Sequence, residues 1–147
     1  HLLLFLINPF EGVQWEATGP ESDANSITFS PNGQGVAICN DDGTAWIYDL
    51  RRTESPIRTF PQSSEGKNNS EESFYDCRFN VNGDTLFTGG VTNRIVAWDT
   101  ISGLEKEVFQ YPTTKPFRCS SLSLTPDGQL LCAGFWDGGV FFCPIKQ

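Results

Sequence analysis

The feature that most constrains the fold is a segment of 23 residues that occurs three times without gaps. The copies read ITFSPNGQGVAICNDDGTAWIYD at 27–49, CRFNVNGDTLFTGGVTNRIVAWD at 77–99 and LSLTPDGQLLCAGFWDGGVFFCP at 122–144. Their turn glycines, Gly33, Gly83 and Gly128, lie 50 and then 45 residues apart. Self-similarity with a period of roughly 20 to 50 residues predicts an architecture in which each copy is one supersecondary unit stacked on the next.

Each copy is expected to form three short β-strands joined by tight turns. Alternating apolar residues such as Ile27 and Phe29 lead into a Pro-Asn-Gly, Val-Asn-Gly or Pro-Asp-Gly turn, which tolerates the positive φ of a tight hairpin. The third strand ends in Tyr48-Asp49, Trp98-Asp99 or Cys143-Pro144. A weaker outer strand is expected before each copy, at about 13–18, 57–60 and 107–109.

Four short strands in about 45 residues predict one blade of a β-propeller. The fold class is therefore expected to be all-β, a partial β-propeller with about three four-stranded antiparallel blades and a remnant of a fourth. We assign residues 1–18 to the remnant, 19–60 and 74–109 to two blades, and 117–147 to a last blade that lacks its closing outer strand. The Ser-, Asn- and Glu-rich segment 61–73 is expected to be a flexible surface loop.

The composition argues against most kinds of catalytic and metal site. The single histidine is His1, which leaves no Ser-His-Asp or Cys-His arrangement and no histidine zinc site inside the chain. The five cysteines lie at least 11 residues apart without a CxxC pair, so neither a metal site nor a disulfide framework is expected. Such cysteines suit a reducing, cytoplasmic setting. No phosphate loop is present either, and we expect no cofactor.

The charge and hydropathy of the chain limit its partners. A formal net charge of -8 argues against nucleic acid or an anionic membrane, since each requires a concentrated Lys/Arg surface. The apolar run 2–7 has six residues, whereas a bilayer-spanning helix needs roughly 20. We therefore expect protein partners, no nucleic acid and no direct membrane insertion.

A unit of this length that ends in Tyr-Asp or Trp-Asp, with an outer strand before three inner ones, resembles the WD-repeat family. Within that family the chain is similar to the β subunit of heterotrimeric G proteins, over roughly residues 19–143. Five segments carry the similarity: ESDAN at 21–25, FSPNG at 29–33, NDD at 40–42, YDLR at 48–51 and FWD at 135–137. Family members form seven-bladed propellers that an N-terminal strand closes. The resemblance therefore implies a native C-terminus after the strand at 140–145, and a beginning inside a longer protein.

The chain also departs from the family pattern. WD repeats typically carry a Gly-His dipeptide before the first inner strand, and its His joins a buried hydrogen-bond network with a Trp, a Ser and an Asp of the second turn. Here Gly19 is followed by Pro20, and no copy has the His. The turn Asp is present as Asp42 and Asp137 but is Thr92 in the middle copy. We therefore expect the network to be incomplete in every blade.

The resemblance implies a partner-binding surface on the narrow face of the propeller. Five residues match positions on that face in G-protein β subunits: Asp23, Asn25, Asp41, Arg118 and Trp136. Two of them have structural alternatives, because Asp41 suits a tight turn with Gly43 and Trp136 suits half-burial between blades. A structural role in turns or in the repeat is expected for Gly33, Asp42, Asp49, Gly83, Trp98, Asp99, Gly128 and Asp137.

By resemblance, the chain is a non-catalytic signalling protein. It would bind a G-protein α subunit, a γ subunit and effectors in signal transduction from transmembrane receptors. Such a protein is cytoplasmic and reaches the inner face of the plasma membrane through its partners. The alternative is a WD-repeat scaffold of another multiprotein complex. An enzyme is the least favoured class, since no carboxylate pair is placed by its spacing across a recognisable cleft.

An open propeller exposes strand edges and apolar walls that neighbouring blades would otherwise cover. At about 25 cal/mol per Å², an uncovered wall on the order of a few hundred Å² forgoes several kcal/mol. We therefore predict that the isolated 147-residue chain self-associates or aggregates. Light scattering and calorimetry check this prediction, and a soluble monomer that melts cooperatively would contradict it.

Overall fold

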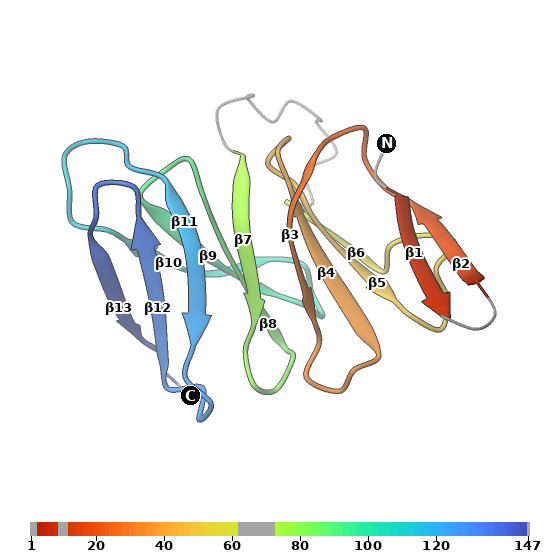
Figure 1. Ribbon diagram of the computed structural model, residues 1–147. Coiled ribbons are helices and arrows are strands. Elements are labelled where there is room, and N and C mark those ends of the chain that lie inside the picture. The colour runs from red at the N-terminus through yellow and green to blue at the C-terminus, as the bar shows by residue number, and fades with distance from the viewer. Residues whose placement is uncertain (1–2, 9–11, 62–72, 147) are drawn as a thin grey trace.

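The computed structural model describes residues 3–8, 12–61 and 73–146, which form thirteen β-strands and no helix. The strands build four antiparallel sheets that follow one another in chain order (Figure 1). The first contains β1 (Leu3–Asn8) and β2 (Gly12–Thr18), and the second contains β3 (Ala24–Phe29), β4 (Gly35–Asn40), β5 (Ala45–Asp49) and β6 (Arg58–Phe60). The third contains β7 (Phe74–Phe79), β8 (Thr85–Gly90), β9 (Arg94–Asp99) and β10 (Glu105–Gln110), and the last contains β11 (Cys119–Leu124), β12 (Leu130–Phe135) and β13 (Val140–Pro144). The predicted fold class, an all-β partial propeller, is confirmed.

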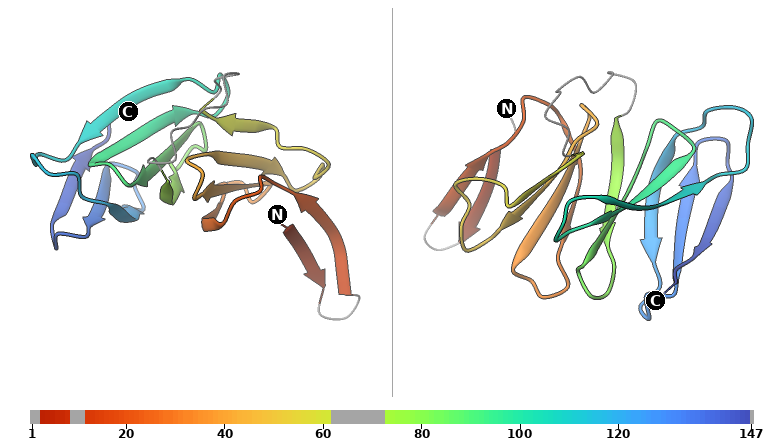
Figure 2. Two further views of the ribbon diagram at one scale, coloured as in Figure 1. Left: turned by 90° about the horizontal axis from the view of Figure 1, so that it is seen from above. Right: turned by 180° about the vertical axis from the view of Figure 1, so that it is seen from behind.

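The sheets stand side by side around an arc, which the view from above shows most clearly (Figure 2). In the three larger sheets the first strand lies on the inner side of the arc, and β6 and β10 lie on the outer side. The inner strands β3, β7 and β11 contact one another in that order. We refer to the three larger sheets as the first, middle and last blades.

The outer strands predicted ahead of the three copies are present, and each pairs with the preceding sheet. β2 pairs with β1, β6 with β5, and β10 with β9. One sequence copy together with its outer strand therefore spans two sheets, which links consecutive blades through the chain itself. The segment predicted as a loop, 61–73, lies outside the described residues except at its ends, where Ser73 is buried.

The first turn of each copy repeats the same backbone geometry. Gly33, Gly83 and Gly128 have φ angles of 70°, 77° and 72°, and among the described residues every positive φ belongs to a glycine. Their amides donate to the carbonyls of Ser30, Asn80 and Thr125 at 2.9, 3.2 and 2.8 Å. The three glycines thus take the left-handed conformation that closes each hairpin, a conformation that costs glycine no steric energy.

Apolar side chains fill the spaces between neighbouring blades. One cluster joins β4, β5 and β6 of the first blade to the middle blade. In this cluster the ring of Phe60, on β6, and the ring of Trp98, on β9, have centroids 5.6 Å apart. A second cluster joins the middle blade to the last one around Phe87 and Leu131. Because the cores lie between the sheets, each blade depends on its neighbours for stability.

A cysteine lies at a close approach between the middle and last blades. All five are free thiols, and four of them are buried: Cys39, Cys77, Cys119 and Cys143. A Cβ atom added to Gly89 on β8 would lie 2.6 Å from the Cys119 sulfur, so this contact admits no larger side chain. Burial raises the pKa of Cys119 to about 12, which keeps this thiol protonated at neutral pH. The Cys119 thiol therefore serves as a small, unreactive core group.

One buried carboxylate connects the inner strands of all three blades. Asp76 on β7 is 5% exposed. Its Oδ1 accepts a hydrogen bond from the Ser26 hydroxyl on β3 at 2.5 Å, and its Oδ2 accepts one from the Leu122 amide on β11 at 2.7 Å. Arg78, also on β7, lies 3.3 Å from the Asp76 carboxylate and donates from Nε to the Leu122 carbonyl at 3.1 Å. The pair of side chains thus holds both backbone groups of Leu122.

We predict that Asp76→Ala lowers the free energy of unfolding by about 3 kcal/mol, because it leaves a buried amide without an acceptor and Arg78 without its counter-charge. Urea-induced unfolding followed by circular dichroism measures the change. Glu54→Ala is the matched control, since Glu54 is exposed in the turn region after β5, and its effect should stay within about 0.5 kcal/mol. Equal effects of the two substitutions would contradict the role given to Asp76.

Candidate functional site

The five residues predicted to bind a partner all lie at one edge of the blades. Asp23 and Arg118 immediately precede the inner strands β3 and β11, and Asn25 is the second residue of β3. Asp41 and Trp136 follow β4 and β12, in the turns that lead to the third strands. This edge is at the top of Figure 1, where β7 and β11 begin, and we call it the upper face.

The upper face is built from three equivalent positions of the repeat. In the order first, middle and last blade, the first position is Asp23, Ser73 and Arg118. The second position is Asn25, Tyr75 and Ser120, and the third is Asp41, Val91 and Trp136. In every blade the amide of the third position donates to the carbonyl of the first, at 2.9, 3.1 and 3.0 Å. The backbone is therefore alike in the three blades, and the side chains alone make one part of the face acidic and another aromatic.

The acidic part lies between the first and middle blades. The Asn25 side-chain amide donates to the Asp41 carboxylate at 3.2 Å and to the Phe74 carbonyl at 2.8 Å, so it reaches from one blade to the next. The Ser73 hydroxyl donates to the Asp41 carbonyl at 2.6 Å. Asp23 and Asp41 are both exposed. These bonds hold the loop of the first blade in place and leave two carboxylates facing solvent.

The turn that contains Asp41 is capped by its neighbour. Asp42 Oδ1 accepts hydrogen bonds from the Thr44 amide at 3.0 Å and the Thr44 hydroxyl at 2.6 Å. The Asp42 amide donates to the Ser22 hydroxyl at 2.9 Å. Within the described part of the chain, the Asp41 carboxylate has a bond from Asn25 and none of these turn bonds. The tight-turn alternative considered for Asp41 therefore fits Asp42 better.

The aromatic part lies between the middle and last blades. Trp136 is 61% exposed, and its ring also lies against the middle blade, so the half-burial given as its alternative applies in part. Its ring stacks on Tyr75, with centroids 6.0 Å apart and an interplanar angle of 26°. The Arg118 guanidinium carbon lies 4.8 Å from the centroid of the Trp136 ring and 5.7 Å from that of Tyr75. We call Tyr75, Arg118 and Trp136 the aromatic clamp.

Tyr75 was not predicted as a site residue. The middle copy has neither an acidic nor an aromatic residue at the third repeat position, where Val91 stands, so that position gives no sign of a binding site in the middle blade. The available signal was its repeat position, since Tyr75 is equivalent to Asn25. Both second-position side chains reach a neighbouring blade, Asn25 through the Phe74 carbonyl and Tyr75 through Trp136.

Four of the residues expected to be structural, Asp42, Trp98, Asp99 and Asp137, have hydrogen-bond partners in their own turn or blade. The Asp99 carboxylate accepts the amides of Ile101 and Ser102 at 2.9 and 2.7 Å, and these bonds lower the pKa of Asp99. The Asp137 carboxylate accepts the Gly139 amide at 2.8 Å. The Trp98 indole donates to the Thr88 hydroxyl at 2.8 Å. In the first blade the Trp46 indole reaches Thr44, which in turn reaches Asp42.

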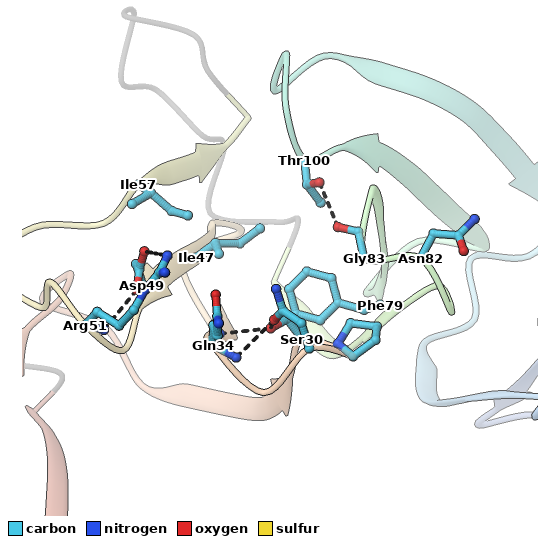
Figure 3. A pocket seen from close by; sticks show the side chains of 13 residues that line it. Ser30, Gln34, Ile47, Asp49, Arg51, Ile57, Phe79, Asn82, Gly83 and Thr100 are labelled. Atoms are coloured by element: carbon cyan, nitrogen blue, oxygen red, sulfur yellow. Dashed lines mark hydrogen bonds and ion pairs between the residues drawn. The ribbon is translucent and has the colours of Figure 1, made fainter.

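A pocket of about 210 Å³, which we call the lower pocket, lies between the first and middle blades at the opposite edge (Figure 3). Its two charged side chains are Asp49 and Arg51, which bond to each other. Arg51 Nε and one terminal nitrogen donate to the two Asp49 oxygens at 2.9 and 2.7 Å. These hydrogen bonds lower the pKa of Asp49 to about 2. A carboxylate that is held in this way suits a structural ion pair rather than a general base.

Metal ligands and membrane-spanning helices are the other features that bear on function. No group of three or more His, Cys, Asp or Glu side chains in this part of the chain is arranged to hold a metal ion. The same residues include no helix of the length and apolar character needed to cross a membrane. The residues that converge on the upper face offer charge, aromatic surface and hydrogen-bond donors, which are the elements of a protein-binding site.

Comparison with known proteins identifies two repeats in the chain. The WD40 family, described as "WD domain, G-beta repeat", matches residues 14–49 and 107–142. Each match begins in an outer strand, β2 or β10, and ends in a third strand, β5 or β13. Like the repeat of this chain, the family repeat therefore runs from the outer strand of one sheet to the third strand of the next.

Several relatives match most of the chain. A guanine nucleotide-binding protein subunit beta from Arabidopsis thaliana is 32% identical over 124 residues, which cover 83% of this chain and 32% of the relative. One from Oryza sativa subsp. indica is 30% identical over 120 residues, or 81% of this chain and 31% of the relative. A subunit beta-1 from Nicotiana tabacum is 32% identical over 123 residues, which cover 81% of this chain and 31% of the relative. The chain thus spans about a third of the length of the relatives it matches.

The ion pair in the lower pocket predicts a pH dependence of stability. Because the folded pKa of Asp49 lies below its ordinary value of 3.8, the pair stabilises the fold above that value. The contribution is lost as the pH falls from about 4 through the folded value near 2. Urea unfolding of wild type and Asp49→Asn between pH 6 and pH 2 should give curves that differ at pH 6 and converge at the acidic end. A constant difference across this range would contradict the prediction.

Proposed function

We propose that this chain, a WD-repeat protein whose relatives include G-protein β subunits, is a non-catalytic module that binds a G-protein α subunit through its upper face. The observation that carries the proposal is the exposed ring of Trp136. It is supported from one side by Tyr75 and Arg118, so a partner meets a rigid apolar surface that loses little side-chain entropy on binding. Trp residues are enriched among interface hot spots.

The acidic part of the upper face supplies selectivity. Asp23 and Asp41 face solvent beside a bond network that reaches Phe74 at the start of β7, next to Tyr75 of the aromatic clamp. A basic segment on the partner would be attracted to these carboxylates, and the net charge of -8 acts in the same direction at longer range. Such charges mainly raise the association rate and disfavour acidic segments at this part of the face.

The remaining parts of the proposal rest on the resemblance to G-protein β subunits. As a β-subunit-like protein, the chain would act together with a γ subunit and effectors in signalling from transmembrane receptors. It would be cytoplasmic and would reach the inner face of the plasma membrane through its partners. No catalytic role is proposed, because the upper face combines binding groups and the charged residues of the lower pocket are paired with each other.

A WD-repeat scaffold in another complex is the second candidate. The middle copy favours it, since its turn carries Val91 and Thr92 in place of two acidic residues. A scaffold would use the same upper face for a different protein. Capture of a partner other than an α subunit, in a manner that depends on Trp136, would favour this candidate.

Binding to a GDP-bound α subunit, measured with the immobilised chain, tests the leading proposal. Trp136→Ala should weaken binding by about 30-fold, corresponding to the loss of about 2 kcal/mol typical of a hot spot. Asp41→Ala should weaken it by about 3-fold, mainly through the association rate and mainly at low salt.

Phe142→Ala is the matched control for this measurement, because Phe142 is an exposed aromatic residue on β13 and lies outside the upper face. Its affinity should equal that of wild type. Unchanged binding by both Trp136→Ala and Asp41→Ala would refute the site.

A further inference from the structure

Arg118 holds its guanidinium against two aromatic rings of different blades. The last blade supplies Arg118 and Trp136, and the middle blade supplies Tyr75. The distances of 4.8 and 5.7 Å to the ring centroids are within the range of cation–π contacts. A long side chain on an exposed surface normally samples many rotamers. Here the stacked rings of Tyr75 and Trp136 restrict the Arg118 side chain to one region of the upper face.

The hydrogen-bond donors of this guanidinium are not used within the described part of the chain. In that part Arg118 accepts a bond at its carbonyl, from the Trp136 amide at 3.0 Å, and its side chain has no acidic residue within ion-pair distance. Contact with an aromatic face uses the flat side of the guanidinium and leaves the N–H groups at its edge. The clamp thus presents an oriented set of donors to solvent.

We propose that the aromatic clamp binds a carboxylate of the partner protein, a glutamate or aspartate that lies next to an apolar side chain. This inference rests on the proposal that the upper face binds a protein. The planar guanidinium fork matches the two oxygens of a carboxylate. The apolar neighbour would cover the exposed face of Trp136. A cationic side chain of the partner is excluded from the clamp, because Arg118 already carries a positive charge there.

The upper face therefore selects a segment with two charges of opposite sign. A basic residue fits the acidic part at Asp23 and Asp41, and an acidic residue fits the clamp at Arg118. Tyr75 is a positioning residue in this arrangement, since it orients the guanidinium of Arg118 through its ring. Its hydroxyl is not required for that role, and the removal of the ring should have a larger effect than the removal of the hydroxyl.

A random 12-residue peptide library, selected on the immobilised chain, tests the inference without knowledge of the natural partner. Peptides that bind wild type should be enriched in Glu or Asp beside an apolar residue. For a selected peptide, Glu→Gln should weaken binding to wild type about 5-fold. The same change in the peptide should weaken its binding to the Arg118→Gln variant by less than about 2-fold, because the positive charge that binds the carboxylate has been removed. Fluorescence polarisation measures the four affinities.

Two substitutions at Tyr75 separate positioning from folding. Tyr75→Phe keeps the ring and should retain the preference for Glu over Gln. Tyr75→Leu removes the π-system, keeps an apolar side chain, and should reduce that preference to about 2-fold, with an unchanged circular dichroism spectrum. Any of three results would overturn the inference. The selected peptides could lack Glu and Asp, the Glu→Gln change could have equal effects on wild type and Arg118→Gln, or no selected peptide could depend on Trp136 for binding. An α subunit that fails to bind a chain with this peptide preference would refute the proposed function and leave the inference standing.

Discussion

The buried Asp76 carboxylate is the interaction on which the arrangement of the blades depends. It accepts bonds from β3 and β11 while it belongs to β7, so the three inner strands share one acceptor group. The apolar clusters between the sheets supply most of the stabilising energy, but such contacts are non-directional. Hydrogen bonds to a charged group require defined distances and angles. Asp76 and Arg78 therefore set the register of neighbouring blades, and the geometry of the upper face follows from that register.

A repeated backbone with variable side chains explains how one face has two chemical characters. The same amide-to-carbonyl bond closes the upper edge of every blade. Since the backbone bonds supply this local structure, the side chains at the three positions are free to differ. The first blade carries Asp23 and Asp41 there, and the last blade carries Arg118 and Trp136. Acidic and aromatic surfaces thus lie on adjacent blades without a change of fold.

The chain lacks the family histidine and uses smaller networks in its place. The Trp98 indole bonds directly to Thr88 in the middle blade, and the first blade has a Trp46–Thr44–Asp42 series. Each such bond contributes about 1 kcal/mol, so the fold does not require the full network. The incomplete network expected from the sequence is compatible with three ordered blades because packing between blades, including that of the buried cysteines, holds them together.

The sequence by itself determined the strands, the turns and the edge at which the candidate residues lie. Alternating apolar residues and glycines at a constant spacing are local signals, and strands and hairpins depend mainly on local signals. The repeat position marks Tyr75, but the contacts of Asp76 and Tyr75 could not be found in this way. Their partners, Ser26, Leu122, Arg118 and Trp136, lie 43 to 61 residues away in sequence. Those contacts exist only after the sheets have packed around the arc. The tertiary structure therefore decided which side chains meet between blades, and with them the aromatic clamp.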